Sequence, residues 1–346
     1  MTTTRAIRTP KKLLDQGLIS EEILPDIEKV TQKYAVSITP AMLGRINDAD
    51  DPVGRQFVPS PLELETTPAE REDPIGDDPY TPVKGITHRY PDRVLLKPLH
   101  VCPVYCRFCF RREVVGPGDA MLKNEQLEAA LDYIRSHPEI WEVIFTGGDP
   151  FIIAPVKLRP MLEALDQIEH VRVVRFHTRI PVVDPGRVTD DLVGALTMKT
   201  PVWVVVHTNH AQEIGPESQQ ALARLAGNGI PLVSQTVLLR GVNDSPEALE
   251  QLFRTLIVNR VKPYYLHHGD MAMGTGHFRT TIDEGQHLMR RLRGRVSGMC
   301  QPTYVLDIPG GYGKVPIGPG YLNAGHTEVT DPWGQQHAYP PVRAED

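Results

Sequence analysis

Apolar runs alternate with amphipathic segments along the chain from residue 93 onward. The apolar runs are short, which predicts strands, at residues 94–99, 143–145, 171–176, 202–206, 232–239 and 264–266. The segments between them carry apolar residues at helical spacing, which predicts helices at residues 124–136, 157–168, 190–198, 217–225 and 246–259. In the first of these, Leu127, Leu131 and Ile134 fall on one helical face. A strand–helix unit repeated in this way predicts an α/β fold with a parallel sheet.

The number of repeated units limits the form of the sheet. Six units are too few for a closed eight-stranded barrel, so we predict a partial (β/α)6 barrel, with a doubly wound sheet as the alternative. A seventh strand at residues 304–306 follows a helix at 282–293 and is expected to complete one edge. We therefore expect an N-terminal region at residues 1–88, the barrel at 89–320 and a C-terminal tail at 321–346.

The N-terminal region has a different pattern from the barrel. Residues 11–34 have helical apolar spacing, and Thr39 followed by Pro40 is typical of a helix start. Residues 48–87 are rich in Pro, Asp and Glu, which predicts an extended, irregular segment. This region is therefore expected to add helices and an extended wrap to the barrel.

Polar residues gather where the predicted strands end. A loop with three cysteines follows the first strand, and further polar groups follow the others: residues 146–149, 177–179 and 207–210, Gln235 and Asp270. In a parallel barrel the carboxyl ends of the strands lie on one face, where barrel enzymes build their active sites. We expect these groups to share one site.

Composition and charge exclude several classes of protein. The formal net charge is −6 and basic residues are scattered, so a nucleic-acid surface is not expected. No apolar run approaches the roughly 20 residues of a membrane span, and the N-terminus lacks the apolar part of a signal peptide. The chain has four cysteines and no disulfide framework, which favours the cytoplasm.

Three of the four cysteines, Cys102, Cys106 and Cys109, form a C-x3-C-x2-C array. Three thiolates on one loop suit a [4Fe–4S] cluster that keeps one iron open to an outside ligand. The alternatives are a zinc site with His100 as fourth ligand, or three reduced thiols without metal. The fourth cysteine, Cys300, is interpreted as a buried thiol.

The array, with Phe108 before its third cysteine, resembles the signature of the radical S-adenosylmethionine (SAM) superfamily. The resemblance implies that SAM chelates the open iron and that its reductive cleavage gives a radical that abstracts hydrogen from carbon. The turn at Thr146, Gly147, Gly148 and Asp149 resembles the motif that holds the SAM amino group there. On its own, this double glycine fits an ordinary turn equally well.

A second glycine-rich segment, at residues 307–314, presents Lys314. It is not a phosphate-binding P-loop, because Ile308 stands where glycine is required and Val315 follows the lysine. A lysine on a bare turn has room for a Schiff base with pyridoxal 5′-phosphate (PLP). A surface lysine after a flexible turn is the alternative.

Motifs from about residue 45 to about residue 322 resemble the lysine 2,3-aminomutase family. They are THRYPDRVLL (87–96), CRFCFRR (106–112), GGD (147–149), RIPVVDPGRVT (179–189), HTNHAQEI (207–214), QTVLLRGVND (235–244), PYYLHHGDMAMGTGHFRT (263–280) and SGMCQPTYVLDIPGGYGKVP (297–316). The resemblance implies an isomerase that uses a [4Fe–4S] cluster, SAM and PLP to move the α-amino group of L-lysine to C3, giving β-lysine. It also implies an electron donor of the flavodoxin or ferredoxin type, and we expect a homo-oligomer.

The resemblance assigns a role to each matching residue. Lys314 is implied as the catalytic lysine that holds PLP. The other implied roles are PLP binding by Arg89, Tyr90 and Arg93, SAM binding by Thr146, Gly147, Gly148, Asp149, His207 and Gln235, and substrate binding by Arg111, Asp270 and Asp307. One arginine and two aspartates suit a molecule with a carboxylate at one end and a cation at the other.

Three alternatives remain from the sequence. One is a glutamate 2,3-aminomutase, although two aspartates would repel its substrate. Another is the family branch that supplies β-lysine for modification of elongation factor P, and the third is an interaction protein that keeps a zinc or a cluster without catalysis. Longer family members carry a zinc site with one ligand after GVND; here Ser245 follows that motif and no cysteine follows Cys300. A short form without this zinc is therefore expected.

Overall fold

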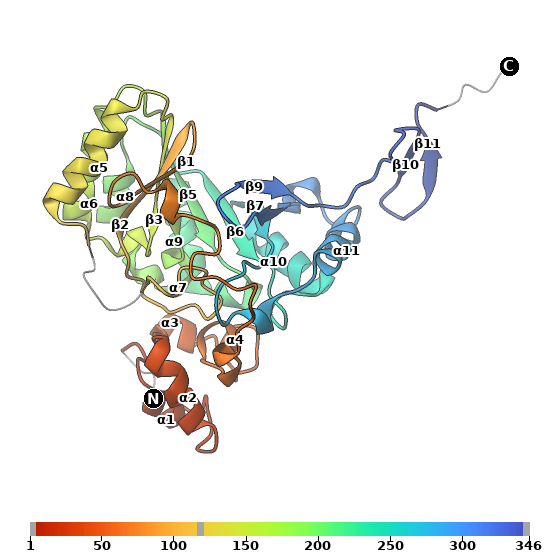
Figure 1. Cartoon of the computed structure of the whole chain (residues 1–346), viewed down its shortest axis with the longest axis horizontal. Helices are drawn as coiled ribbons and strands as arrows, with labels where there is room; N and C mark the ends of the chain where they lie inside the picture. Colours follow the sequence, from red (N-terminus) through yellow and green to blue (C-terminus); the bar gives the residue numbers. More distant parts are fainter. Residues whose placement is uncertain (1–4, 116–120, 342–346) are drawn as a thin grey trace.

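In the computed structural model, which describes residues 5–115 and 121–341, nine strands form one sheet in the chain order β1 to β9. They are β1 (Ile86–Tyr90), β2 (Arg93–Leu99), β3 (Glu142–Gly147), β4 (Val173–Thr178), β5 (Val202–His207), β6 (Leu232–Val237), β7 (Val261–His267), β8 (Thr303–Asp307) and β9 (Lys314–Pro316). Strands β2 to β8 are parallel, and β1 and β9 are antiparallel edges. The sheet curls into an open half-barrel (Figure 1), so the predicted partial barrel is confirmed and the doubly wound alternative is wrong.

Helices connect successive parallel strands. They are α5 (Asn124–Ser136), α6 (Pro155–Asp166), α8 (Asp190–Leu196), α9 (Pro216–Gly227), α10 (Pro246–Val258) and α11 (Ile282–Leu292), and a short α7 (Ile180–Val183) precedes α8. Because right-handed crossovers between neighbouring strands place every helix on the same side, the opposite side of the sheet stays open for a site. The apolar stripe predicted for α5 is buried at Leu131 and Ile134.

The seventh strand does not form the edge that the sequence predicted. Strand β8 pairs with β7, and the edge is β9, which runs back along β8 with Lys314 opposite Asp307. Gly310, Gly311 and Gly313 all have positive φ, between 85° and 91°. Since side chains disfavour this conformation, the glycines allow the reversal that brings the lysine to the aspartate.

The N-terminal region contains α1 (Pro10–Asp15), α2 (Leu24–Lys33), α3 (Pro40–Leu43) and α4 (Gly54–Phe57). The single helical segment predicted at residues 11–34 is two helices, separated by a turn in which Gly17 has a φ of 70°. The helix start predicted at Thr39 is present, because the Thr39 hydroxyl accepts a hydrogen bond from the Met42 amide. These helices lie beside one end of the half-barrel (Figure 1).

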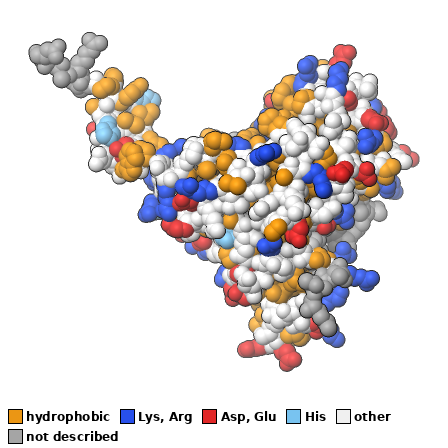
Figure 2. All heavy atoms as spheres, turned by 180° about the vertical axis from the view of Figure 1, so that it is seen from behind, with side chains coloured by type: hydrophobic (Ala, Val, Ile, Leu, Met, Phe, Trp, Pro, Cys, Tyr) orange, Lys and Arg blue, Asp and Glu red, His pale blue; other side chains and the backbone are white. Residues whose placement is uncertain are grey.

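The C-terminal segment projects from the body as a hairpin of β10 (Glu328–Thr330) and β11 (Gln336–Ala338) (Figure 1). Acidic and basic side chains are interspersed over the face drawn in Figure 2. None of the helices in the described part of the chain has both the length and the apolar character that crossing a bilayer needs.

Candidate active site

A cavity of about 780 Å³ lies on the concave side of the sheet. Its size is in the range of pockets that hold cofactors and small substrates. Residues from the ends of several strands meet in it, as expected for a parallel barrel. Every residue with an assigned role lines it: Cys102, Cys106, Cys109, Arg89, Tyr90, Arg93, Arg111, Thr146, Gly147, Gly148, Asp149, His207, Gln235, Asp270, Asp307 and Lys314.

The thiols of Cys102, Cys106 and Cys109 share one part of this cavity. Burial raises the pKa of each, to about 11 for Cys109, because a thiolate is poorly solvated there. Iron would supply the positive charge that three thiolates need, so the donors fit a cluster with an open iron. His100, the candidate fourth zinc ligand, is not among the described residues that line the cavity.

A buried ion-pair cluster holds the cysteine loop in place. Arg107 and Arg112 of the loop both donate to the carboxylate of Glu63, and all three side chains are at most 1% exposed. The ring of Tyr34 lies 3.5 Å from the Arg112 guanidinium carbon. Since Tyr34 and Glu63 belong to the N-terminal region, this region is part of the scaffold of the site.

The double-glycine turn is packed against the start of the cysteine loop. The amides of Gly148 and Asp149 donate to the carbonyls of Leu99 and Val101, at 2.7 and 2.9 Å. A Cβ on Gly148 would lie 2.2 Å from the Val101 carbonyl oxygen. These two amides are therefore used within the protein, and the glycine at position 148 is needed for close packing.

The carboxylate of Asp149 also has partners within the protein. It accepts hydrogen bonds from the Thr178 hydroxyl at 2.6 Å and from the Arg179 amide at 2.7 Å. Burial raises its pKa to about 6 despite these bonds. Asp149 therefore joins the ends of β3 and β4, a role the sequence did not suggest.

Two histidines from neighbouring strands meet in the cavity. His207 Nε2 lies 3.2 Å from His177 Nδ1, and Gln235 pairs with His207 in the sheet. Burial lowers the pKa of both rings, that of His207 to about 3. The pair is neutral at pH 7, so it offers hydrogen bonds without adding charge.

Strand β9 presents Lys314 to a group of polar side chains. Its Nζ lies 2.8 Å from Asp307 Oδ2 and 3.3 Å from His267 Nδ1, and its amide donates to the Tyr90 hydroxyl at 2.7 Å. Burial and the lysine charge lower the pKa of His267 to about 4. Sequence reasoning missed His267, although its position directly after the sixth predicted strand, at residues 264–266, was the available signal.

The two aspartates assigned to the substrate differ in charge state. The pKa of Asp307 is held far below its usual range by hydrogen bonds and charge from His267 and Lys314, which outweigh its burial. Burial and the neighbouring Asp307 raise the pKa of Asp270 to about 7. Two carboxylates with a single nearby ammonium therefore separate into one that is ionised and one that readily holds a proton.

Asp77 joins two arginines that the sequence assigned to different ligands. Its carboxylate accepts from Arg89 at 2.6 Å and from Arg111 at 2.8 Å, and Lys97 lies 4.0 Å away. Arg111 also donates to the Thr146 hydroxyl at 3.4 Å. Sequence reasoning missed Asp77 because nothing in the acidic stretch around it marks one carboxylate as buried.

Comparison with known proteins agrees with this site. A model described as the radical SAM superfamily matches residues 96–253, and one described as lysine-2,3-aminomutase matches residues 289–329. The L-lysine 2,3-aminomutase of Clostridium subterminale is 41% identical over 326 residues, 93% of this chain and 78% of that protein. That of Bacillus subtilis is 38% identical over 92% of this chain and 68% of that protein.

A protein named for a different substrate also matches. The glutamate 2,3-aminomutase of Clostridioides difficile is 39% identical over 86% of this chain and 70% of that protein. The half-barrel, the three-cysteine loop and these matches define a radical SAM enzyme. The chain belongs to the lysine 2,3-aminomutase family and is an aminomutase, hence an isomerase.

Proposed function

We propose that this aminomutase depends on PLP and converts L-lysine to β-lysine by moving the α-amino group to C3. The observation that carries the proposal is the charge arrangement of the cavity: Arg111 and the pair Asp270 and Asp307 line the same space. A guanidinium suits a carboxylate, and two aspartates suit an ammonium. Lysine has these groups at opposite ends of an extended chain.

The residues around Lys314 fit PLP. Arg89 and Arg93 can neutralise a phosphate, and the Tyr90 hydroxyl holds the Lys314 amide. Gly313 lies against Tyr90, and a Cβ there would come 3.2 Å from the tyrosine oxygen, so the glycine lets the turn that carries Lys314 approach this tyrosine closely. When bound, PLP would supply an electron-delocalising carrier for the migrating nitrogen.

The chain itself contributes position, charge and exclusion of water. Arg111 fixes one end of the substrate and the aspartates fix the other, so C3 is held at one place in the cavity. The neutral pair His177 and His207 can hydrogen-bond without attracting a competing anion. Asp307 already holds an ammonium, that of Lys314, at 2.8 Å, which supports its role toward a second ammonium.

The test is anaerobic turnover by reconstituted enzyme with SAM and dithionite, comparing L-lysine, L-glutamate and L-ornithine. We expect β-lysine from lysine, little product from ornithine, whose side chain is one methylene shorter, and none from glutamate. Removal of PLP should abolish turnover, and added PLP should restore it. Turnover of glutamate in preference to lysine would refute the substrate assignment.

Variants connect the substrate to the aspartates. Asp270→Asn should lower kcat/KM for lysine by at least about 30-fold, since loss of one partner of a buried charge pair costs about 2–5 kcal/mol. Asp283→Asn, which changes an exposed aspartate of α11, should keep the wild-type value. Wild-type kcat/KM for lysine in the Asp270 variant would contradict the proposed reading of the ammonium.

A further inference from the structure

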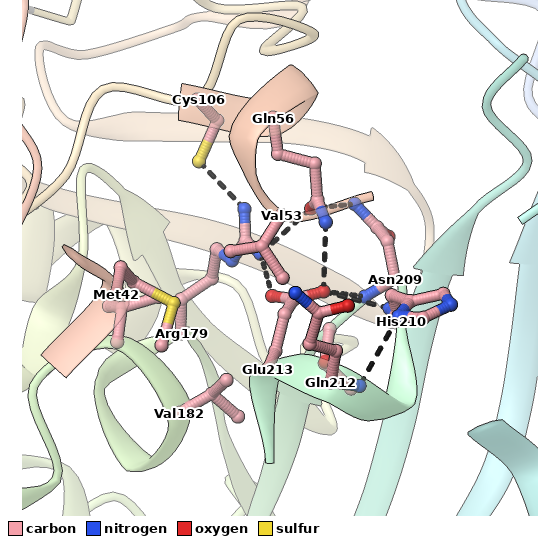
Figure 3. A network of polar contacts seen from close by, with 12 residues as sticks. Met42, Val53, Gln56, Cys106, Arg179, Val182, Asn209, His210, Gln212 and Glu213 are labelled. Atoms are coloured by element: carbon pink, nitrogen blue, oxygen red, sulfur yellow. Dashed lines mark hydrogen bonds and ion pairs between the residues drawn. The ribbon is translucent and has the colours of Figure 1, made fainter. Parts of the chain in front are cut away.

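Arg179, the residue after β4, donates a hydrogen bond to one of the three cysteine sulfurs. Its Nη1 lies 2.9 Å from Cys106 Sγ (Figure 3). Its Nη2 donates to the carboxylate of Glu213 and, at 3.2 Å, to Gln56 Oε1. The guanidinium therefore has a cysteine sulfur on one side and a carboxylate on the other.

The partner carboxylate is itself fixed. Glu213, in the 3-10 helix η5 (Ala211–Glu213), is fully buried and accepts from the amides of Asn209 and His210, each at 2.8 Å (Figure 3). Gln56 Nε2 donates to the same carboxylate at 3.1 Å. Because Glu213 cannot move without losing these bonds, it holds the direction of the Arg179 side chain.

Aromatic rings and the N-terminal region complete the enclosure of the guanidinium. The Phe57 and Phe108 rings lie 5.0 and 5.4 Å from its central carbon. Arg179 is 8% exposed, so its charge acts on Cys106 with little screening by water. Gln56 and Phe57 belong to α4, so the contact depends on how the N-terminal region closes over the loop.

We propose that Arg179 is a positioning residue that raises the reduction potential of the [4Fe–4S] cluster by donating to the Cys106 thiolate. The proposal rests on the proposed binding of this cluster to Cys102, Cys106 and Cys109. Hydrogen bonds to the sulfurs and local charge are among the determinants of cluster potentials. The reduced cluster carries one more negative charge than the oxidised one, so a fixed cationic donor stabilises the reduced form more.

Glu213 should act in the opposite direction. Its carboxylate offsets part of the Arg179 charge and adds a negative charge near Cys106. In Glu213→Gln the side chain keeps its shape and loses this charge, so the guanidinium acts more strongly on the sulfur. Loss of the arginine should therefore lower the potential, and loss of the glutamate charge should raise it.

The experiment measures iron content and the cluster midpoint potential in the full-length, anaerobically reconstituted enzyme. The proteins are the wild type, Arg179→Met, Glu213→Gln and a control, Arg175→Met. Arg175 lies on β4, the strand that Arg179 follows, and lines the same cavity, and its ion pair with Glu142 at 2.9 Å involves no sulfur. The potential is followed by the electron paramagnetic resonance signal of the reduced cluster in a redox titration.

We expect Arg179→Met to lower the potential by a tenfold change in the reduction equilibrium, about 59 mV for one electron, and Glu213→Gln to raise it. The control should shift it by less than a third as much. An unchanged potential in Arg179→Met with wild-type iron content would overturn the proposal, as would a fall in Glu213→Gln.

The variants and the wild type together distinguish failure of the proposed role of Arg179 from failure of the proposed cluster binding. If Arg179→Met binds no iron, Glu213→Gln decides alone: a higher potential supports the proposal, and an unchanged or lower one overturns it. A merely structural role would lower iron content in both variants without moving the two potentials in opposite directions. A wild-type chain that binds no iron would refute the proposed cluster itself.

Discussion

Replacing Asp270 by asparagine should stabilise the cofactor-free protein, and the gain should depend on pH. The carboxyl of Asp270 has an ordinary pKa of 3.8, which burial and Asp307 raise to about 7 in the folded chain. Between these values the unfolded chain releases the proton while the folded chain keeps it. Wild-type stability therefore falls as pH rises through this interval and is flat above it. An asparagine does not titrate and removes this loss.

The size of the effect follows from the interval. Each pKa unit corresponds to about 1.4 kcal/mol, so the loss is about 1.5 kcal/mol at pH 5 and about 4 kcal/mol at pH 8. Any packing change in Asp270→Asn is the same at both pH values and cancels. The advantage of the variant should thus grow by about 3 kcal/mol between pH 5 and pH 8, which is roughly 5 °C in Tm for a chain of this size.

The assay is thermal unfolding of cofactor-free wild type and variant at both pH values. Asp51→Asn is the matched control, because hydrogen bonds from the Gly54 and Asn47 amides outweigh burial and lower the pKa of Asp51, so its stabilising contribution is lost only as the pH falls below about 4. This control should lower Tm by similar amounts at pH 5 and pH 8, since it removes the same hydrogen bonds at both pH values and Asp270 keeps its neighbours. If the Asp270→Asn advantage does not grow with pH, the carboxyl does not titrate near neutrality and the reasoning fails.

Three further predictions concern the other buried charges. Lys314→Ala should lose the PLP label that borohydride fixes to the wild-type chain, whereas Lys97→Ala should keep it, and a label mapped to another lysine would contradict the assignment. Asp77→Asn leaves the arginines around it without their carboxylate, so inorganic phosphate should raise its Tm at least twice as much as that of the wild type; an equal rise would show that they form no anion site. Glu63→Gln should cost about 3–5 kcal/mol of unfolding free energy, because two buried guanidinium groups lose their charged partner. Asp26→Asn, which breaks an exposed ion pair, should cost less than about 1 kcal/mol. Equal losses of unfolding free energy in the two variants would refute the importance of burial.

Periodicity was sufficient for the helices and parallel strands because apolar spacing records which side of each element is buried. Strand β9 was not predicted because three residues are too few to show an alternating apolar pattern. The glycines before it reverse the direction of the chain, and apolar spacing does not reveal such a reversal. The co-location of polar residues at strand ends followed from the parallel topology alone. Parallel topology therefore predicted that Asp270 and His207 line the site, because both residues come at or after the carboxyl end of a predicted strand.

What the sequence did not predict are the partners of buried charges. Asp77, Glu63 and Gln56 all lie in the segment predicted as an irregular wrap, and each contacts residues of the barrel through side chains. Such contacts depend on how distant segments fold together, which local patterns do not contain. The irregular composition of this segment indicated only that it lacks long helices and strands.

Under the proposed function, one site serves both a lysine of the protein and a lysine substrate, and the charges around Lys314 suit both. Without ligands, the Lys314 ammonium lies against Asp307, and Asp270 can hold a proton at pH 7. If Lys314 is joined covalently to a cofactor, its amine no longer provides that ammonium, and a substrate ammonium can take its place beside the two carboxylates. The number of cations facing the aspartates would then be the same without ligands and at substrate entry, before the substrate nitrogen displaces Lys314 from the cofactor. A glutamate side chain would instead bring a third carboxylate to the same place, so the site should discriminate against it through charge, whatever its length.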